Sequence, residues 1–238
     1  AGVSRGTVDR VLHNRGSVKK ELELKIRTLA KELGYVPNRG GRAVASIKDR
    51  YKIGIMLPSI GNAFFEGVIE GIDKAIEEYK ELGVEVIVKK VQGYNEEVHL
   101  GAIEELKRSG CAALCLATID TPKVADKINE CQKLGIKIIL VNSDVHNTKK
   151  ICYVGSDYIK AGKTCAGLLS LISKQPKLDI LVVTGSKLMC GHRQRIEGFK
   201  EELEALKVDF NICAQIESND SDITAQIETS KYLKEHQN

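Results

Sequence analysis

Residues 52–91, KIGIMLPSIGNAFFEGVIEGIDKAIEEYKELGVEVIVKKV, have the pattern of a β-strand, an amphipathic helix and a second β-strand. The apolar run at 52–58 is short and unbroken, as in a strand buried on both faces of a sheet. The same alternation continues to the end of the chain and predicts an α/β fold, a parallel sheet with helices on both faces. Strands are predicted at 52–58, 84–91, 112–118, 137–143, 151–156, 179–185 and 209–216, and helices near 62–82, 95–109, 122–134, 158–174, 191–206 and 221–236.

The carboxyl ends of these strands are the expected ligand site, because ligands of open parallel sheets bind there. Six of these ends are rich in amides, hydroxyls and carboxylates, and we expect aromatic side chains at one of them only, Phe64 and Phe65. The six ends are residues 59–65, 92–95, 118–121, 142–144, 156–157 and 187–195. Such groups suit a polyhydroxylated ligand, so the sequence predicts a site for a sugar or a polyol.

The composition is that of a globular protein in a reducing compartment. A chain of 238 residues with 42% apolar side chains can form one large domain or two modest ones with a real core. Since no run approaches the ~20 apolar residues of a membrane span, and no signal peptide is recognisable, we expect a cytoplasmic protein without membrane contact. The seven cysteines are irregularly spaced and are expected to be small buried side chains. Cys111 and Cys115 are spaced like half a metal site, but no second pair follows, and no metal site is predicted.

Motifs for nucleotide binding and catalysis are incomplete. Gly162, Lys163 and Thr164 match the end of a Walker phosphate loop, but Asp157 stands where that loop needs a glycine. No GxGxxG follows the first strand, and no serine, cysteine or histidine lies in a recognised catalytic motif. The sequence therefore predicts neither an enzyme nor a cofactor. Asp157 is expected to cap the helix that follows it and to contact the ligand.

Charge is unevenly divided along the chain. The first 50 residues hold twelve Lys or Arg against five Asp or Glu, whereas the other 188 hold 24 against 27. A basic head suits contact with phosphate backbones, although a solvated charged helix explains the lysines of 19–31 almost as well. Ser4 is typical of a helix N-cap whose hydroxyl accepts the Thr7 amide. A second helix is predicted over 18–33, with an apolar stripe of Leu22, Ile26, Leu29, Ala30 and Leu33.

The chain starts with AGVSRGTVDRVLHNRG (1–16), which is followed by a basic helix and then by LGYVPN (33–38). These segments closely resemble the headpiece of the lactose-repressor (LacI/GalR) family of bacterial transcription factors. The resemblance runs from residue 1 to about 46. It implies a helix-turn-helix whose second helix lies in the DNA major groove. It also implies that the first helix of the motif precedes Ala1, so that the headpiece as given is under-packed and binds DNA weakly. The residues that match the family's DNA contacts are Arg5, Gly6 and Arg10 toward base edges and Ser4 and Thr7 toward phosphates.

Residues 38–50 match the hinge of this family, which becomes a helix in the minor groove when two subunits meet on an operator. Asn38 matches the family's asparagine. Val44 stands where the family inserts a leucine between base pairs, and valine is a shorter wedge than leucine. A plain flexible linker is the alternative.

The body resembles the type I periplasmic-binding-protein fold, especially its ribose-receptor branch. Asn62, Phe64 and Phe65 stand where that branch binds and stacks on the sugar, with core packing as the alternative for the two rings. Arg195, in RQRIEGF (193–199), matches an arginine that reaches a sugar hydroxyl.

One pair of residues departs from the ribose branch. That branch has Asp-Arg where this chain has Asn142 and Ser143, so the resemblance does not imply ribose itself. Asn142 is still expected at the ligand, and Asp144 or Asp157 is expected to supply the missing carboxylate.

The resemblance implies a transcriptional regulator, a repressor, that binds operator DNA as a homodimer and responds to a small sugar or polyol. The predicted organisation is an incomplete headpiece at 1–37, a hinge at 38–50, one lobe at 51–165 and an incomplete second lobe at 166–238, where the last helix has no closing strand. One alternative is a periplasmic sugar receptor without DNA function, which would need a signal peptide and no basic head. The other is a small-molecule kinase, which would need the phosphate loop that Asp157 interrupts.

Overall fold

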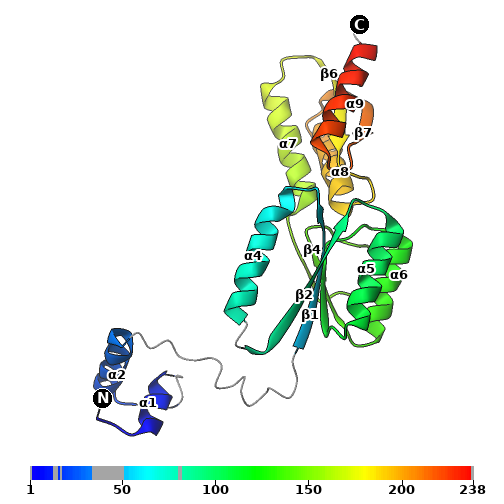
Figure 1. Cartoon of the computed structure of the whole chain (residues 1–238). Helices are drawn as coiled ribbons and strands as arrows, with labels where there is room; N and C mark the ends of the chain where they lie inside the picture. Colours follow the sequence, from blue (N-terminus) through cyan, green and yellow to red (C-terminus); the bar gives the residue numbers. More distant parts are fainter. Residues whose placement is uncertain (1, 13–15, 17, 34–50, 80–81, 237–238) are drawn as a thin grey trace. The chain divides into compact units, whose positions relative to one another are not determined.

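The computed structural model describes residues 2–12, 16, 18–33, 51–79 and 82–236. The chain divides into two compact units, residues 1–49 with 81–83 and residues 50–80 with 84–238 (Figure 1). The predicted hinge at 38–50, with Asn38 and Val44, lies outside the described residues.

Two helices make up the described part of the headpiece, α1 (Arg5–Leu12) and α2 (Lys20–Glu32). The Ser4 hydroxyl accepts a hydrogen bond from the Thr7 amide at 3.2 Å, which confirms the predicted N-cap. Val11 and Ile26 are both 3% exposed, whereas Leu33 is 75% exposed. The apolar stripe predicted for the second helix is therefore buried at Ile26 but not at its carboxyl end.

The first lobe (residues 51–154) is built on a parallel sheet of five strands in the order β2-β1-β3-β4-β5. Figure 1 shows α5 and α6 on one face of this sheet and α4 on the other. This arrangement confirms the predicted α/β fold. The strands are β1 (Tyr51–Ile60), β2 (Val84–Gln92), β3 (Ala113–Leu116), β4 (Lys137–Val141) and β5 (Cys152–Val154), and the helices are α4 (Phe64–Tyr79), α5 (Glu96–Arg108) and α6 (Pro122–Lys133).

The main core of the first lobe lies between the sheet and the pair α5 and α6. Five completely buried side chains pack there: Met56, Leu114 and Leu140 of the strands and Ile103 and Ile128 of the helices. Close packing also explains a glycine within β1, because a Cβ on Gly54 would lie 2.7 Å from Leu114 Cδ2. The strand ends above this core are therefore held firmly in place.

The second lobe (residues 158–235) contains two parallel strands, β6 and β7, with three helices. Its elements are α7 (Tyr158–Ile172), β6 (Lys177–Thr184), α8 (Cys190–Ala205), β7 (Asp209–Glu217) and α9 (Asp222–Glu235). Glycines bring α7 and α8 together, since a Cβ on Gly162 would lie 2.7 Å from the Phe199 nitrogen. The predicted lobe boundary at 165 and 166 falls within α7, which packs against α8 of the second lobe.

The cysteines are less buried than predicted. Cys111, Cys131 and Cys190 are buried and Cys115 is half-buried, but Cys152, Cys165 and Cys213 are exposed, so the expectation was wrong for these three. Cys152 lies on β5 at the edge of the first sheet, and Cys213 lies on the two-stranded second sheet. An apolar run predicts a strand, but the position of that strand in its sheet decides which of its side chains are covered.

No helix among the described residues combines the length and the apolar character that crossing a membrane requires.

Candidate functional site

The exposed side of α1 carries the residues that the sequence assigned to DNA contact. Arg5, Gly6 and Arg10 are exposed, and Ser4 and Thr7 join their hydroxyl groups at 2.9 Å at the start of the helix. Two cationic side chains and two hydroxyl groups thus lie on the solvent side of a helix whose other side holds buried Val11. Such a helix suits insertion into a groove of DNA. Contact with DNA remains a prediction for all five residues.

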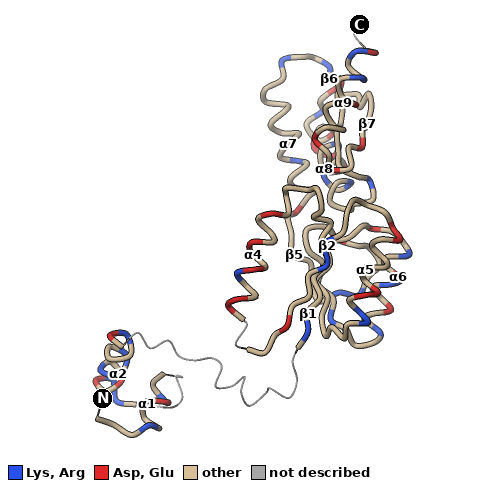
Figure 2. The backbone as a smooth tube through the Cα atoms, viewed as in Figure 1, with Lys and Arg blue, Asp and Glu red and all other residues tan. Residues whose placement is uncertain are grey.

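The charge on α2 is mixed rather than uniformly basic (Figure 2). Arg27 donates to the Glu23 carboxylate at 2.9 Å, an ion pair between residues four apart on an exposed face. This pairing agrees with the solvated-helix alternative for the lysines of 19–31.

A cavity of about 660 Å³ lies between the strand ends of the first lobe and the second lobe. Five residues that the sequence predicted as ligand contacts line it: Asn62, Phe64, Phe65, Asn142 and Arg195. Its volume is within the range of about 300–1,000 Å³ that is usual for small-molecule sites. We refer to this cavity as the cleft.

The two phenylalanines have different surroundings. The Phe64 side chain is 59% exposed at the cleft, whereas Phe65 is 2% exposed and packs with Leu57 and Ala117 in the core beneath it. Their rings meet edge to face, with centroids 5.2 Å apart. Phe64 therefore offers an open aromatic face to a ligand, and Phe65 fits the packing alternative.

Asp220, which follows β7, brings a carboxylate into the cleft. Its Oδ2 accepts a hydrogen bond from Asn62 Nδ2 at 2.8 Å and another from the Tyr94 hydroxyl, so it joins the second lobe to the first. Burial, with Asp220 alongside, raises the pKa of Tyr94 above its usual range, and Tyr94 remains a donor. Gly185 leaves space for this contact, because a Cβ there would overlap Asp220 and His192.

Sequence reasoning missed Asp220 and Tyr94, although a signal for each was present. Asp220 lies at the carboxyl end of the seventh strand, whereas the predicted ligand site comprised the ends of the first six strands only. Tyr94 lies within the strand end at 92–95, so the expectation of aromatic side chains at one strand end only was wrong. The physical rule that ligands bind at strand ends would have found both residues.

Arg195 is held at the cleft by a chain of contacts that crosses between the lobes. Its guanidinium carbon lies 4.3 Å from the centroid of the Tyr158 ring, a cation–π contact. The Tyr158 hydroxyl in turn donates to Asn142 Oδ1 at 2.6 Å. Asn142 adopts a left-handed backbone conformation, with φ of 62°, where β4 ends. These contacts fix the direction of the one arginine that the sequence assigned to the ligand.

His192 is a further cleft residue that the sequence analysis did not name. Its Nδ1 lies 2.9 Å from the Ser186 amide nitrogen and 3.1 Å from the Ser186 carbonyl oxygen, so the Ser186 backbone holds the ring in place. Burial lowers the pKa of His192. The neutral imidazole is thus a hydrogen-bonding group of the cleft wall at neutral pH.

Asp144 and Asp157 are not among the residues that line the cleft. Asp144 pairs with Lys150 at 2.7 Å. Asp157 caps α7 by accepting the Lys160 amide at 3.0 Å, and this bond lowers its pKa. The predicted cap is confirmed, but the aspartates that line the cleft are Asp220 and Asp222.

Two family models match the chain. Residues 53–238 match a periplasmic binding protein domain, and residues 1–38 match bacterial regulatory proteins of the lacI family. The chain is 29% identical over 209 residues to the HTH-type transcriptional regulator GntR of Pseudomonas aeruginosa, a match that covers 86% of this chain and 56% of the relative. It is 30% identical over 214 residues to the NTD biosynthesis operon regulator NtdR of Bacillus subtilis, covering 88% and 59%. The chain thus spans just over half the length of these relatives.

Solved structures with the same fold include sugar- and polyol-binding proteins. A glucose-galactose binding protein from Geobacillus stearothermophilus superimposes with a TM-score of 0.69 at 21% identity, covering 79% of this chain and 65% of that one. A Caulobacter myo-inositol binding protein bound to myo-inositol gives a TM-score of 0.69 at 18% identity, covering 79% and 62%. At these identities the likeness concerns the fold alone.

Proposed function

The chain belongs to the lacI family of bacterial regulatory proteins and carries a periplasmic-binding-protein domain, and from this membership we propose that it is part of a transcriptional repressor controlled by a sugar or polyol. In this proposal the headpiece binds operator DNA and the cleft binds the effector. The observation that carries the proposal is that a single chain joins a lacI headpiece to a polar cleft between two lobes.

The chemistry of the cleft supports a polyhydroxylated effector. Asp220 provides a carboxylate, Arg195 a cation, and Asn62 and Asn142 provide amides, while Phe64 offers an apolar ring face. A sugar ring has hydroxyl groups at its rim and C–H groups on its faces, so it can use both kinds of group. Arg195 is the cation that the cleft lining supplies, which favours a neutral sugar over a phosphorylated one.

Control of DNA binding is proposed to act through the angle between the lobes. Contacts that cross the cleft, from Asp220 to Asn62 and from Tyr158 to Asn142, favour one arrangement of the lobes. An effector that bonds to both walls shifts the population of lobe arrangements by its difference in affinity for them. In a homodimer this shift changes the spacing of the two headpieces on a pseudo-palindromic operator, and thereby the affinity for DNA.

Replacement of Arg5 tests the DNA-binding half of the proposal. If its guanidinium forms a bidentate contact with a guanine edge, Arg5→Ala in the full-length protein loses about 1–3 kcal/mol of discrimination between operator and scrambled DNA. Fluorescence anisotropy with an operator selected from a random library measures this difference. Arg108→Ala is the matched control, because it removes an exposed arginine from α5 in the other unit.

An unmodified protein that binds operator and scrambled DNA equally would contradict the repressor proposal. It would favour the alternative of a sugar-binding receptor without DNA function. Turnover of ATP or of a sugar by the full-length protein would contradict the proposal that no catalysis occurs.

A further inference from the structure

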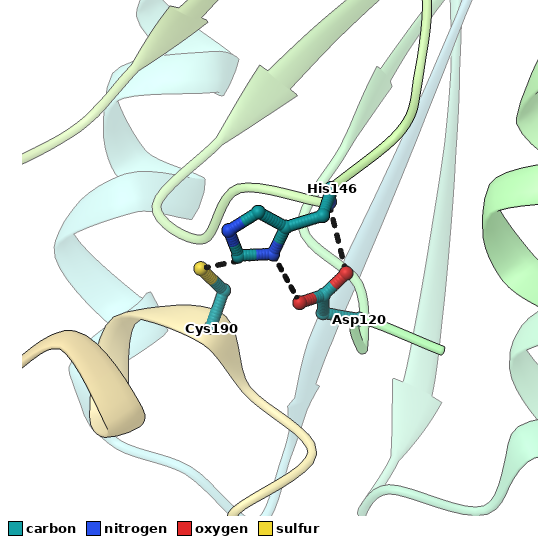
Figure 3. A group of neighbouring side chains, drawn as sticks. All are labelled: Asp120, His146 and Cys190. Atoms are coloured by element: carbon teal, nitrogen blue, oxygen red, sulfur yellow. Dashed lines mark hydrogen bonds and ion pairs between the residues drawn. The ribbon is translucent and has the colours of Figure 1, made fainter. Parts of the chain in front are cut away.

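Asp120, His146 and Cys190 form a cluster beside the cleft (Figure 3). A carboxylate oxygen of Asp120, a ring nitrogen of His146 and the sulfur of Cys190 all lie within 4.8 Å of one another. Asp120 follows β3 and His146 follows β4 in the first lobe, whereas Cys190 begins α8 of the second. The cluster therefore draws its side chains from both lobes.

The three side chains differ in exposure. Cys190 is fully buried and the Asp120 side chain is 8% exposed, whereas the His146 side chain is 60% exposed. Asp120 is also fixed by its backbone, because its amide donates to the Leu188 carbonyl at 2.7 Å. The cluster thus has two fixed groups in the interior and one movable group that faces solvent.

A catalytic Cys-His-Asp triad does not explain the arrangement. In such a triad the nucleophile and the carboxylate contact opposite nitrogens of the imidazole. Here both groups approach Nδ1, with Asp120 Oδ2 at 2.6 Å and Cys190 Sγ at 3.9 Å. Burial also raises the pKa of the Cys190 thiol to about 11, which opposes a reactive thiolate. The three atoms converge on one point instead of forming a relay.

We propose that Asp120, His146 and Cys190 bind a divalent cation of the zinc class at this point. Zinc accepts oxygen, nitrogen and sulfur ligands in tetrahedral geometry, and its usual bond lengths place neighbouring ligand atoms about 3.3–3.6 Å apart. The oxygen-to-nitrogen and nitrogen-to-sulfur distances of 2.6 and 3.9 Å require shifts of less than about 1 Å to reach those values. Exposed His146 can take up these two shifts, and the Asp120 oxygen and the Cys190 sulfur lie within 4.8 Å of each other.

The charges of the cluster suit such an ion. On binding, the Cys190 thiol proton passes to solvent, and the proton of the neutral His146 ring moves from Nδ1 to Nε2, so that Nδ1 is free for the metal. The resulting thiolate and the carboxylate together neutralise a divalent cation. The Arg193 guanidinium donates to the same Asp120 oxygen, Oδ2. A carboxylate oxygen has two lone pairs, so Arg193 keeps one and the metal takes the one now directed at Nδ1. Arg193 then acts as an outer partner that orients the ligand.

A cation held in this way would join the two lobes next to the cleft. Met189 and Gly191, on either side of Cys190, line the cleft, as does Ser143, whose hydroxyl accepts the Gly191 amide at 3.4 Å. Metal binding at this point does not depend on DNA binding and can be measured without DNA.

The test is metal titration of the full chain, reduced and freed of metal, with Zn²⁺ against a chromogenic chelator and then with Co²⁺ as a spectroscopic probe. We expect one equivalent to bind and a thiolate-to-cobalt charge-transfer band in the near ultraviolet. Cys190→Ser should abolish the band and weaken binding by at least about 100-fold. His146→Asn should weaken binding similarly while the band persists at saturating Co²⁺.

Cys165→Ser is the matched control, because Cys165 is an exposed cysteine on α7 outside the cluster, and it should leave affinity and spectrum unchanged. Far-ultraviolet circular dichroism of the metal-free variants checks their folding. If Cys190→Ser does not fold, the metal affinity of His146→Asn, a substitution at an exposed position, tests the proposal by itself. The proposal is overturned if no stoichiometric binding occurs, or if affinity survives both His146→Asn and Cys190→Ser, which would show an adventitious ion only.

Discussion

The two lobes are built from the same alternation of strand and helix, but they bury their apolar side chains to very different extents. In the first lobe Leu114, Leu116 and Leu140 are completely covered, whereas Leu171 and Ile172 of the second lobe are 83% and 75% exposed. The first lobe has five paired strands to cover its helices, and the described second lobe has two. Local pattern therefore sets the elements, and the number of neighbouring strands sets how far each is buried.

This difference divides the cleft into two kinds of wall. On the first-lobe side, Asn62 and Phe64 follow a strand anchored in the main core. On the second-lobe side, Arg195 and Asp220 depend on the close contact of α7 with α8 and on hydrogen bonds that cross the cleft. We expect the first wall to be rigid and the second to adjust to a ligand.

The largest effect is expected from a pair of leucine-to-alanine substitutions, one at a buried position in the first lobe and one at an exposed position in the second. Leu114→Ala should lower the free energy of unfolding by about 2–5 kcal/mol, because it leaves a cavity among covered side chains. Leu171→Ala, at an exposed position on α7, should change it by less than about 0.5 kcal/mol. Urea denaturation followed by circular dichroism measures both values. Equal losses would show that the lobes do not differ in packing as described.

A smaller effect is expected at the adjustable wall of the cleft. Asp220→Asn should weaken binding of an effector found by thermal-shift screening by roughly 10- to 150-fold, because hydrogen bonds to a charged group contribute about 1.5–3 kcal/mol. Isothermal titration calorimetry gives the affinity. Asp144→Asn is the control, since Asp144 pairs with Lys150 outside the cleft lining. A larger loss for Asp144→Asn would restore the assignment made from sequence.

The smallest effect concerns two histidines with lowered pKa, buried His99 in the first lobe and half-buried His192 in the second. Burial lowers the pKa of each below its usual value of 6.5. The unfolded chain therefore binds more protons in the window between the folded pKa and 6.5, so stability is fully present above pH 6.5 and is lost as pH falls through that window. The slope is at most about 1.4 kcal/mol per pH unit for each histidine.

Urea denaturation at several pH values, for the unmodified protein, His99→Gln and His192→Gln, measures these contributions. Each variant should lose less stability than the unmodified protein between pH 7 and pH 5. Because the second-lobe wall of the cleft is expected to be the more adjustable one, His192→Gln should change the slope of the free energy of unfolding against pH less than His99→Gln does. Identical pH profiles for all three proteins would contradict the lowered pKa of both rings.

The strands and helices of the fold could be predicted from the sequence because periodicity is a local property. The strand predicted at 52–58 extends over Tyr51–Ile60, and the one predicted at 151–156 shortens to Cys152–Val154 at the edge of the sheet. An edge strand has one neighbour, so fewer of its residues are held by pairing. The prediction that Cys152 is buried was wrong for the same reason.

The site was less predictable, because its members meet through tertiary contacts. Asn62 and Arg195 were placed by family resemblance, and both line the cleft. Asp220 lies 158 residues from Asn62 along the chain, and no sequence motif connects them. The cluster of Asp120, His146 and Cys190 likewise has no recognisable spacing and becomes visible only when the lobes are brought together.

The most direct test of the central claim is operator affinity with and without a saturating effector, measured by fluorescence anisotropy on the full-length protein. The proposal predicts that the effector changes operator affinity by at least about 5-fold, the lower end of ordinary allosteric coupling. It also predicts that Asp220→Asn raises the effector concentration required by the factor it loses in effector affinity. An operator affinity that is the same at saturating effector as without it would contradict the claim that the cleft controls the headpiece.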